Sequence, residues 1–131
     1  MTIAPNILAR LKEITGPDRW VSDPNDLTPF LSEPRGRFHG QTPLLMLPAS
    51  TAQVAAIVTE CAAHQIPIVP QGGNTGLVGG QIPSSSVSDQ IIVNLRRMNR
   101  IRDIDPVAGT MTAEAGCILA AVQTAATAVD R

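Results

Sequence analysis

The chain has 131 residues, 44% of them hydrophobic, and ten Lys plus Arg against eleven Asp plus Glu give a net charge of −1. This length suits one packed domain, and so balanced a charge excludes the broad positive field that recruits nucleic acid. No apolar stretch reaches the length of a membrane span, roughly 18 residues, and the first residues lack the apolar core of a secretory signal. We therefore expect a cytoplasmic protein with no membrane span. The two cysteines, Cys61 and Cys117, belong to no CxxC pair or Cys/His cluster, so we predict no disulfide framework and no metal site.

The first 42 residues are expected to form one helix and an irregular lead-in. Residues 6–16 carry apolar side chains at helical spacing and end with Gly16, a typical helix stop. Residues 17–42 are rich in Pro, Gly, Asp and Arg, which favours irregular structure with one brief helix around residues 26–31.

Residues 43–83 have the pattern of a strand, a helix and a second strand. PLLMLP at 43–48 is a compact apolar run typical of a buried strand, and Ser50 with Gln53 forms a capping-box pattern that begins a helix. The helix should pack through an apolar stripe of Val54, Ile57, Val58 and Cys61. IPIVP at 66–70 is the second strand, so these lengths predict a right-handed crossover and parallel pairing of the two strands.

A glycine-rich loop, PQGGNTGLVGG at 70–80, begins at the carboxyl end of that second strand. Ligands of open α/β sheets bind at this position, and successive backbone N–H groups can hold an anion there. Asn74 and Thr75 add short polar side chains that can donate to phosphate oxygens. The loop is neither a Walker loop nor a Rossmann fingerprint, since Lys12 is the only lysine and GxGxxG is absent. An ordinary glycine-rich turn is the alternative.

The last third of the chain should add a strand, a hairpin and a helix. IIVNL at 91–95 is a third apolar strand, and residues 101–105 and 110–114 alternate in polarity around a turn. An Ala-rich helix, 117–131, is apolar on nearly all sides and needs covering on more than one. Four arginines could contact phosphate, but solvent exposure is favoured for them: Arg96, Arg97, Arg100 and Arg102. The element order predicts an α/β (α+β) fold, a small parallel βαβ unit with flanking helices followed by the start of a mainly antiparallel β subdomain.

Three stretches together resemble a known family: residues 43–83, IIVNLRRMNRI at 91–101, and DPVAGTMTAEAGCIL at 105–119. They are similar to the opening FAD-binding segment of the vanillyl-alcohol oxidase and p-cresol methylhydroxylase superfamily. Within it they most resemble the FAD-linked D-2-hydroxyacid dehydrogenases, which include D-lactate and D-2-hydroxyglutarate dehydrogenases and a glycolate oxidase subunit. The resemblance implies that the whole chain is the N-terminal part of an FAD-binding domain. Its sections are a lead-in (1–42), a βαβ unit with the pyrophosphate loop (43–83), and strands, hairpin and closing helix (90–131).

The resemblance also implies the site. The loop 71–77 would wrap the FAD pyrophosphate with backbone N–H groups, and the turn 114–116 would approach the cofactor. Relatives that tether FAD covalently use a histidine in this loop, where this sequence has Asn74, so we expect non-covalent FAD. The cofactor-binding residues expected on this basis are Pro70, Gln71, Gly72, Gly73, Asn74, Thr75, Gly76, Leu77, Glu114 and Gly116.

The activity implied by the resemblance is oxidation of a D-2-hydroxy acid. In the family, the residues that bind substrate and remove its proton lie in a later domain. We therefore expect no catalytic residue in this chain, a small 2-hydroxy acid partner only in a full-length enzyme, and an FAD-binding portion that is inactive alone. The alternative is a non-enzymatic module that binds a nucleotide phosphate or has a structural role, and that self-associates through the exposed apolar surface of its last helix.

Overall fold

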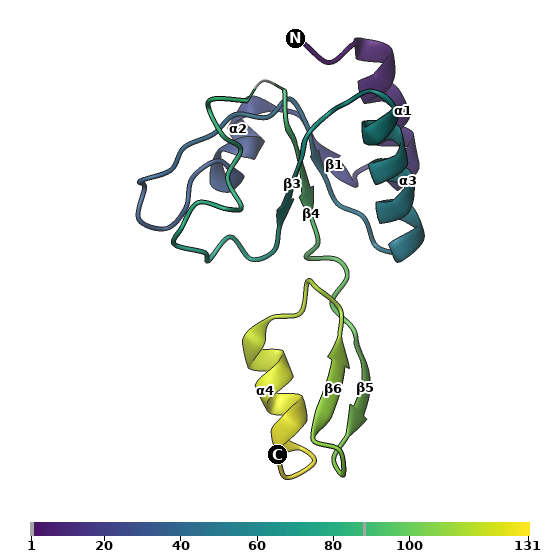
Figure 1. Cartoon of the computed structure of the whole chain (residues 1–131), viewed down its shortest axis with the longest axis vertical. Helices are drawn as coiled ribbons and strands as arrows, with labels where there is room; N and C mark the ends of the chain where they lie inside the picture. Colours follow the sequence, from purple (N-terminus) through teal and green to yellow (C-terminus); the bar gives the residue numbers. More distant parts are fainter. Residues whose placement is uncertain (1, 88) are drawn as a thin grey trace.

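The computed structural model describes residues 2–87 and 89–131, and in it the chain folds into a larger and a smaller part (Figure 1). The larger part is built around a four-stranded sheet, and the smaller part is a two-stranded hairpin with one helix beside it. Within the described residues, no helix combines the length and hydropathy that a membrane crossing requires. The parallel α/β unit followed by an antiparallel hairpin confirms the predicted fold class.

The sheet of the larger part has the strand order β1-β2-β4-β3. β2 (Leu45–Met46), β4 (Ile91–Asn94) and β3 (Ile68–Gln71) run parallel. The predicted pairing of the two strands around α3 (Thr51–Ala63) is therefore wrong, because β4 lies between β2 and β3. All four residues of β4 are buried. A strand with apolar side chains on both faces removes more apolar surface from water at the centre of a sheet than at its edge, which explains the central position of β4.

β1 (Trp20–Val21) pairs antiparallel with β2 at the edge of the sheet and lies in a segment predicted to be irregular. Two residues are too few for an alternating pattern, so their pairing with Met46 and Leu45 has no signal in the sequence. The brief helix predicted in the same segment is present as α2 (Pro24–Leu27) followed by a 3₁₀ turn, η1 (Thr28–Phe30).

Helices cover both faces of the sheet (Figure 1). α1 (Pro5–Thr15) and α3 pack on one face, and α2 packs on the other. The first face buries Ile3, Leu11, Leu44, Met46, Ile57, Cys61, Ile91 and Val93, and the second buries Leu27, Leu45, Leu47, Val69 and Ile92. Most of the apolar surface that the chain removes from water therefore lies in this part, which gives the end of the sheet a rigid support.

The predicted helix ends are present. α1 ends at Gly16, whose φ is +81°. At the start of α3 the Ser50 hydroxyl accepts from the Gln53 backbone N–H at 3.2 Å, while the Gln53 side chain accepts from the Ala49 N–H at 2.7 Å. The predicted apolar stripe of α3 is wrong at one position, since Val58 is 47% exposed and faces away from the sheet core.

The smaller part consists of β5 (Ile101–Asp105), β6 (Thr110–Ala113) and α4 (Leu119–Thr127). The predicted hairpin turn is present, with the Asp105 carboxylate accepting from the N–H groups of Val107 and Ala108. Among the described residues of these three elements none is buried, and α4 is shorter than predicted. The smaller part therefore has no apolar core of its own.

Gly116 joins the smaller part to the end of β4. Its N–H donates to the Met98 carbonyl at 2.8 Å, and a Cβ at this position would lie 2.0 Å from the Leu95 carbonyl oxygen. We predict that Gly116→Ala lowers the free energy of unfolding by about 2 kcal/mol or more, because backbone atoms must move to admit the methyl group. Urea unfolding measures this, with Gly80→Ala as the control, since a Cβ on Gly80 meets nothing within 4 Å. Equal stabilities for the two variants would contradict this packing.

Candidate functional site

The glycine loop and the end of β4 are held together by two buried side chains, Gln71 and Asn94. These residues are paired in register at the carboxyl ends of β3 and β4. The Asn94 amide donates to the Gln71 side-chain oxygen at 3.0 Å and to the Gly72 carbonyl at 3.1 Å. The Gln71 amide donates to the carbonyls of Phe30 and Gln81 at 3.0 and 3.1 Å. The pair thereby connects both ends of the loop to the sheet and to the α2–η1 segment.

A second loop, residues 33–40, packs against the glycine loop. Buried Glu33 organises it, because its carboxylate accepts from the backbone N–H groups of Arg35, Arg37 and Phe38. Burial acts to raise the pKa of Glu33, but these backbone donors hold it below its ordinary value. The Phe38 ring lies directly against Gly79, where φ is +79° and a Cβ would be 2.6 Å from the ring. The turn at Gly79 therefore needs glycine for reasons internal to the chain.

Three other glycines of the loop have no such reason. A Cβ on Gly72 or Gly80 would meet nothing within 4 Å, and one on Gly73 would meet only a Thr75 methyl group at 3.9 Å. None of the three has a positive φ, so the backbone conformation does not require glycine at these positions. The residue with positive φ is Asn74, at +56°. Gly72 and Gly73 therefore leave space beside the backbone that no part of the described chain fills.

That space belongs to a cleft of about 800 Å³ between the glycine loop, the end of β4 and the start of α4. The first turn of α4 lacks a side-chain cap, so backbone N–H groups at the helix start are free to meet an anion. The residues lining the cleft are Pro29, Phe30, Gly72, Gly73, Asn74, Thr75, Asn94, Arg96, Asn99, Ala115, Gly116, Cys117, Ile118 and Leu119.

The structure divides the ten predicted cofactor-binding residues into two groups. Gly72, Gly73, Asn74, Thr75 and Gly116 line the cleft together. Pro70, Gln71, Gly76, Leu77 and Glu114 do not line it. Gln71 and Glu114 are buried and bound by neighbours, whereas Pro70, Gly76 and Leu77 face solvent. A cofactor contact remains a prediction for each of the ten.

The Asn74 side chain is turned toward η1. Its amide donates to the Ser32 carbonyl at 2.8 Å and the Pro29 carbonyl at 3.2 Å, and its own oxygen is buried without a partner among the described residues. The amide therefore ties the middle of the loop to the α2–η1 segment.

Sequence reasoning did not place several other residues at the cleft, among them Phe30, Asn94, Arg96 and Asn99. The arginine cluster was visible in the sequence, but not which of its members would face the cleft. The Arg96 guanidinium lies over the Phe30 ring, with its central carbon 5.2 Å from the ring centroid. The Arg97 guanidinium instead donates to the Leu47 carbonyl at 3.0 Å.

Arg100 and Arg102 form an ion-pair cluster with buried Glu114. The Glu114 carboxylate accepts from the Arg100 backbone N–H at 2.9 Å and from both guanidinium groups at 3.1–3.3 Å. The hydrogen bond from the Arg100 N–H, with those from the two guanidinium groups, lowers the pKa of Glu114 to about 2. Burial of the carboxylate acts in the opposite direction. Both side chains are solvent-exposed as predicted, at 78% and 47%, and both also hold the hairpin to the turn at residues 114–116.

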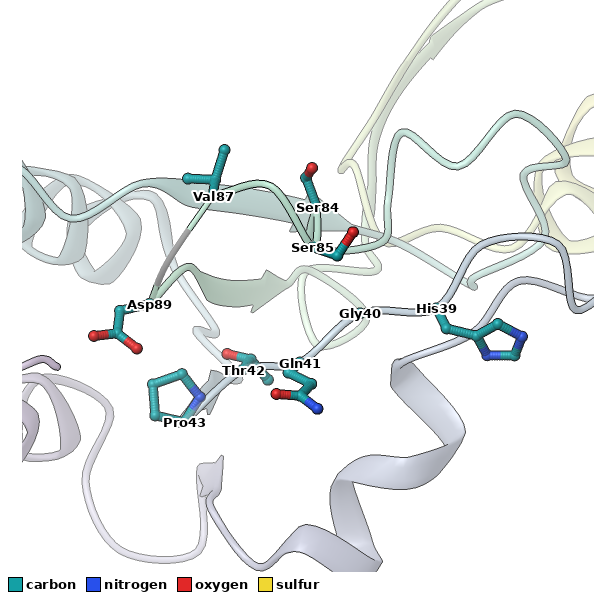
Figure 2. Close-up of a pocket in the computed structure, with 9 residues that line it drawn as sticks. All are labelled: His39, Gly40, Gln41, Thr42, Pro43, Ser84, Ser85, Val87 and Asp89. Atoms are coloured by element: carbon teal, nitrogen blue, oxygen red, sulfur yellow. The ribbon is translucent and has the colours of Figure 1, made fainter. Parts of the chain in front are cut away.

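A second cavity, of about 620 Å³, is lined by serine, histidine and aspartate side chains without forming a nucleophilic triad (Figure 2). His39 points away from Ser84 and Ser85, and Asp89 lies on the opposite side of both serines. His39 is bound to the Gly36 carbonyl at 2.8 Å. His64 lies outside both the cleft and this cavity, at the end of α3, beside Glu60 and Arg10.

A family model described as an FAD binding domain matches residues 42–130. The chain belongs to this family. FAD is therefore the cofactor of the domain to which the chain contributes, as the resemblance predicted.

Curated relatives place the chain in the predicted branch. It is 42% identical over 108 residues to the mitochondrial D-2-hydroxyglutarate dehydrogenase of Arabidopsis thaliana, and 39% identical over 114 residues to a D-2-hydroxyglutarate–pyruvate transhydrogenase of Saccharomyces cerevisiae. These alignments cover 82% and 86% of this chain but 19% and 22% of the relatives, so the chain spans about a fifth of their length. The mitochondrial location is that relative's, and a cytoplasmic location for this chain stays a prediction.

Solved structures confirm the fold type. Alkyldihydroxyacetonephosphate synthase matches with a TM-score of 0.82 and p-cresol methylhydroxylase with 0.79, each at 22% identity. The matches cover 95% of this chain and 25% and 24% of those chains. The chain thus has the fold of one part of a p-cresol methylhydroxylase type FAD enzyme.

The cleft fits a cofactor that carries phosphates. The missing Cβ atoms of Gly72 and Gly73 leave room for close approach to the backbone, and Thr75 supplies a hydroxyl donor beside them. No ionised carboxylate lines it among the described residues, so a negative ligand meets no like charge there.

We predict that Gly73→Val abolishes FAD binding without lowering stability much. The valine side chain would occupy the space beside the loop backbone, whereas φ at this position is not left-handed and imposes no strain. Flavin absorbance after desalting and thermal unfolding of the apo-protein measure the two effects. Gly80→Val is the matched control, because Gly80 is equally open but does not line the cleft. Full flavin retention in the Gly73 variant would contradict the assignment of the loop.

We predict that the Glu114 cluster makes the protein sensitive to acid. In the folded state the pKa of the Glu114 carboxyl is below its ordinary value of 4.5. The stability that the ionised carboxylate contributes is therefore complete above about pH 4.5 and is lost as the pH falls toward 2. Urea unfolding between pH 6 and pH 2 should show this loss, and Glu114→Gln should flatten it. An unchanged pH dependence in the variant would assign the acid sensitivity to other carboxylates.

Proposed function

We propose that the chain is the N-terminal FAD-binding portion of a flavin-dependent oxidoreductase that oxidises a D-2-hydroxy acid of the lactate, 2-hydroxyglutarate or glycolate type. The observation that carries this is the cleft in which Gly72 and Gly73 leave their backbone open to a ligand. The substrate class is supported by the names of the curated relatives, which are D-2-hydroxyglutarate and D-lactate dehydrogenases.

The residues of this chain position the cofactor. When bound, FAD supplies the redox chemistry by accepting hydride from the substrate. The loop N–H groups would bind the pyrophosphate, and the Gln71–Asn94 pair keeps the loop in place. Among the described residues that line the cleft there is no His, Asp, Glu or Lys to serve as a general base. The base should therefore come from the later domain that the resemblance implies, and this chain alone should be inactive.

The FAD should be held non-covalently. Asn74 stands where covalently linked relatives have histidine, and a carboxamide lacks the nucleophilic ring nitrogen of that residue. Its amide is already bonded to the carbonyls of Ser32 and Pro29, which supports a structural role for the side chain.

Self-association without catalysis is the second candidate. Ile118 and Leu119 are 74% and 69% exposed, and α4 buries no residue. Exposed apolar surface of this kind favours contact with another chain or with a further part of the same chain.

One set of measurements tests these proposals. We expect the 131-residue chain or the full-length protein to retain yellow flavin near one per chain after desalting, and acid denaturation to release all of it. With a dye acceptor, the full-length protein should oxidise D-2-hydroxyglutarate or D-lactate, while the chain alone should not. Turnover by the chain alone would overturn its inactivity. Absence of flavin from both samples, with a dimer in light scattering, would favour the second candidate.

A further inference from the structure

Arg96 is the only charged side chain among the described residues that line the cleft. Lys12, the sole lysine, lies over the Trp20 ring at 3.9 Å and does not line the cleft. A pyrophosphate carries two negative charges, and a loop of backbone N–H groups offers partial charges only. The cleft therefore has one side chain that can supply a full positive charge.

The other three arginines of the cluster are engaged elsewhere. Arg100 and Arg102 are both paired with the Glu114 carboxylate, and Arg97 donates to a carbonyl of the larger part. In the described part of the chain, no carboxylate lies within ion-pair distance of the Arg96 guanidinium. Arg96 thus keeps its charge available for a ligand.

Arg96 is also held in position relative to the glycine loop. Its backbone N–H donates to the Asn94 side-chain oxygen at 3.1 Å, and the amide of the same Asn94 donates to the Gly72 carbonyl. On the other side, the guanidinium stacks over Phe30, whose carbonyl accepts from Gln71. The Gln71–Asn94 pair therefore positions both the backbone at Gly72 and the chain at Arg96. This lowers the conformational entropy that the protein would lose on binding a ligand.

We propose that the Arg96 guanidinium binds the pyrophosphate of FAD and determines the affinity of this site for phosphate-bearing ligands. The inference rests on the proposed function insofar as FAD occupies this cleft. Guanidinium groups form paired, charge-assisted hydrogen bonds with phosphate oxygens. The Arg96 side chain is exposed and lines the cleft, so its donors are available to a ligand there. Arg96 is thus a binding residue for the cofactor and has no part in proton transfer.

The test uses the apo form of the full-length protein and isothermal titration with FAD and with ADP at 50 and 300 mM NaCl. Arg96→Gln should weaken both ligands roughly 10- to 100-fold at the lower salt concentration, as expected for one charge-assisted contact. It should also reduce the salt dependence of the affinity, because one screened charge pair is gone. Arg96→Lys should recover only the part of the loss that depends on charge, because a lysine cannot form the paired hydrogen bonds of a guanidinium group. Arg19→Gln is the matched control, an exposed arginine outside the cleft, and should bind like the wild type.

Each outcome decides between distinct explanations. Wild-type affinity and salt dependence in Arg96→Gln would overturn the proposal while leaving FAD binding intact. Equal losses in the Gln and Lys variants would assign the effect to the Phe30 stack and also overturn it. A wild-type protein that binds no FAD would instead overturn the proposed function. Thermal unfolding of the apo-variants accompanies the titrations, and Arg96→Met, which also removes the charge, carries the test if Arg96→Gln is unstable.

Discussion

The arrangement of the site depends on the hydrogen bond between the side chains of Gln71 and Asn94. Gln71 ends the edge strand β3 and Asn94 ends the neighbouring central strand β4, and both side chains are nearly inaccessible to water. A buried amide group left without a partner would cost about 1–3 kcal/mol. Arrangements of the chain that break these hydrogen bonds are therefore disfavoured, and the network selects the one in which all of them form. That arrangement sets the path of the glycine loop, the approach of Phe30 and the direction in which the chain leaves β4. A structural pair thus organises a binding cleft that Gln71 itself does not line.

Local patterns predicted most of the elements, whereas the order of the strands could not be derived from them. Helical periodicity, the Ser50 cap and Gly16 were sufficient for α1 and α3, and alternation around an Asp-Pro turn was sufficient for the hairpin. The insertion of β4 between β2 and β3 is a long-range pairing. Its only trace in the sequence is that IIVN is apolar on both faces. Exposed Val58 shows a related limit, because an apolar residue at helical spacing does not need to face the core.

Sequence reasoning predicted the loop that lines the cleft, but not the hydrogen-bond partners of the polar residues in and around it. A glycine-rich loop after a parallel strand predicts a ligand, and the loop does line the cleft. A polar side chain in such a segment can face either the ligand or the protein, and spacing does not distinguish the two. Gln71 turns inward to two carbonyls, and Glu114 turns inward to two arginines. The same ambiguity applied to the arginine cluster, where one carboxylate binds two of the four arginines and only the fold reveals which two.

The five glycines between residues 72 and 80 fall into two groups. At some of them a neighbouring residue leaves no room for a side chain, and at the others the space is open. Gly79 lies against the Phe38 ring and Gly76 against the Gln81 amide, so contacts within the chain account for both. Gly72, Gly73 and Gly80 meet no such neighbour, and their φ angles would accept other residues. An ordinary glycine-rich turn explains the first two glycines but not the other three, since alanine would cost less backbone entropy there. Only Gly72 and Gly73 of those three line the cleft. Close approach of a ligand to the backbone is the prediction that accounts for glycine at these two positions, because contacts within the described chain do not.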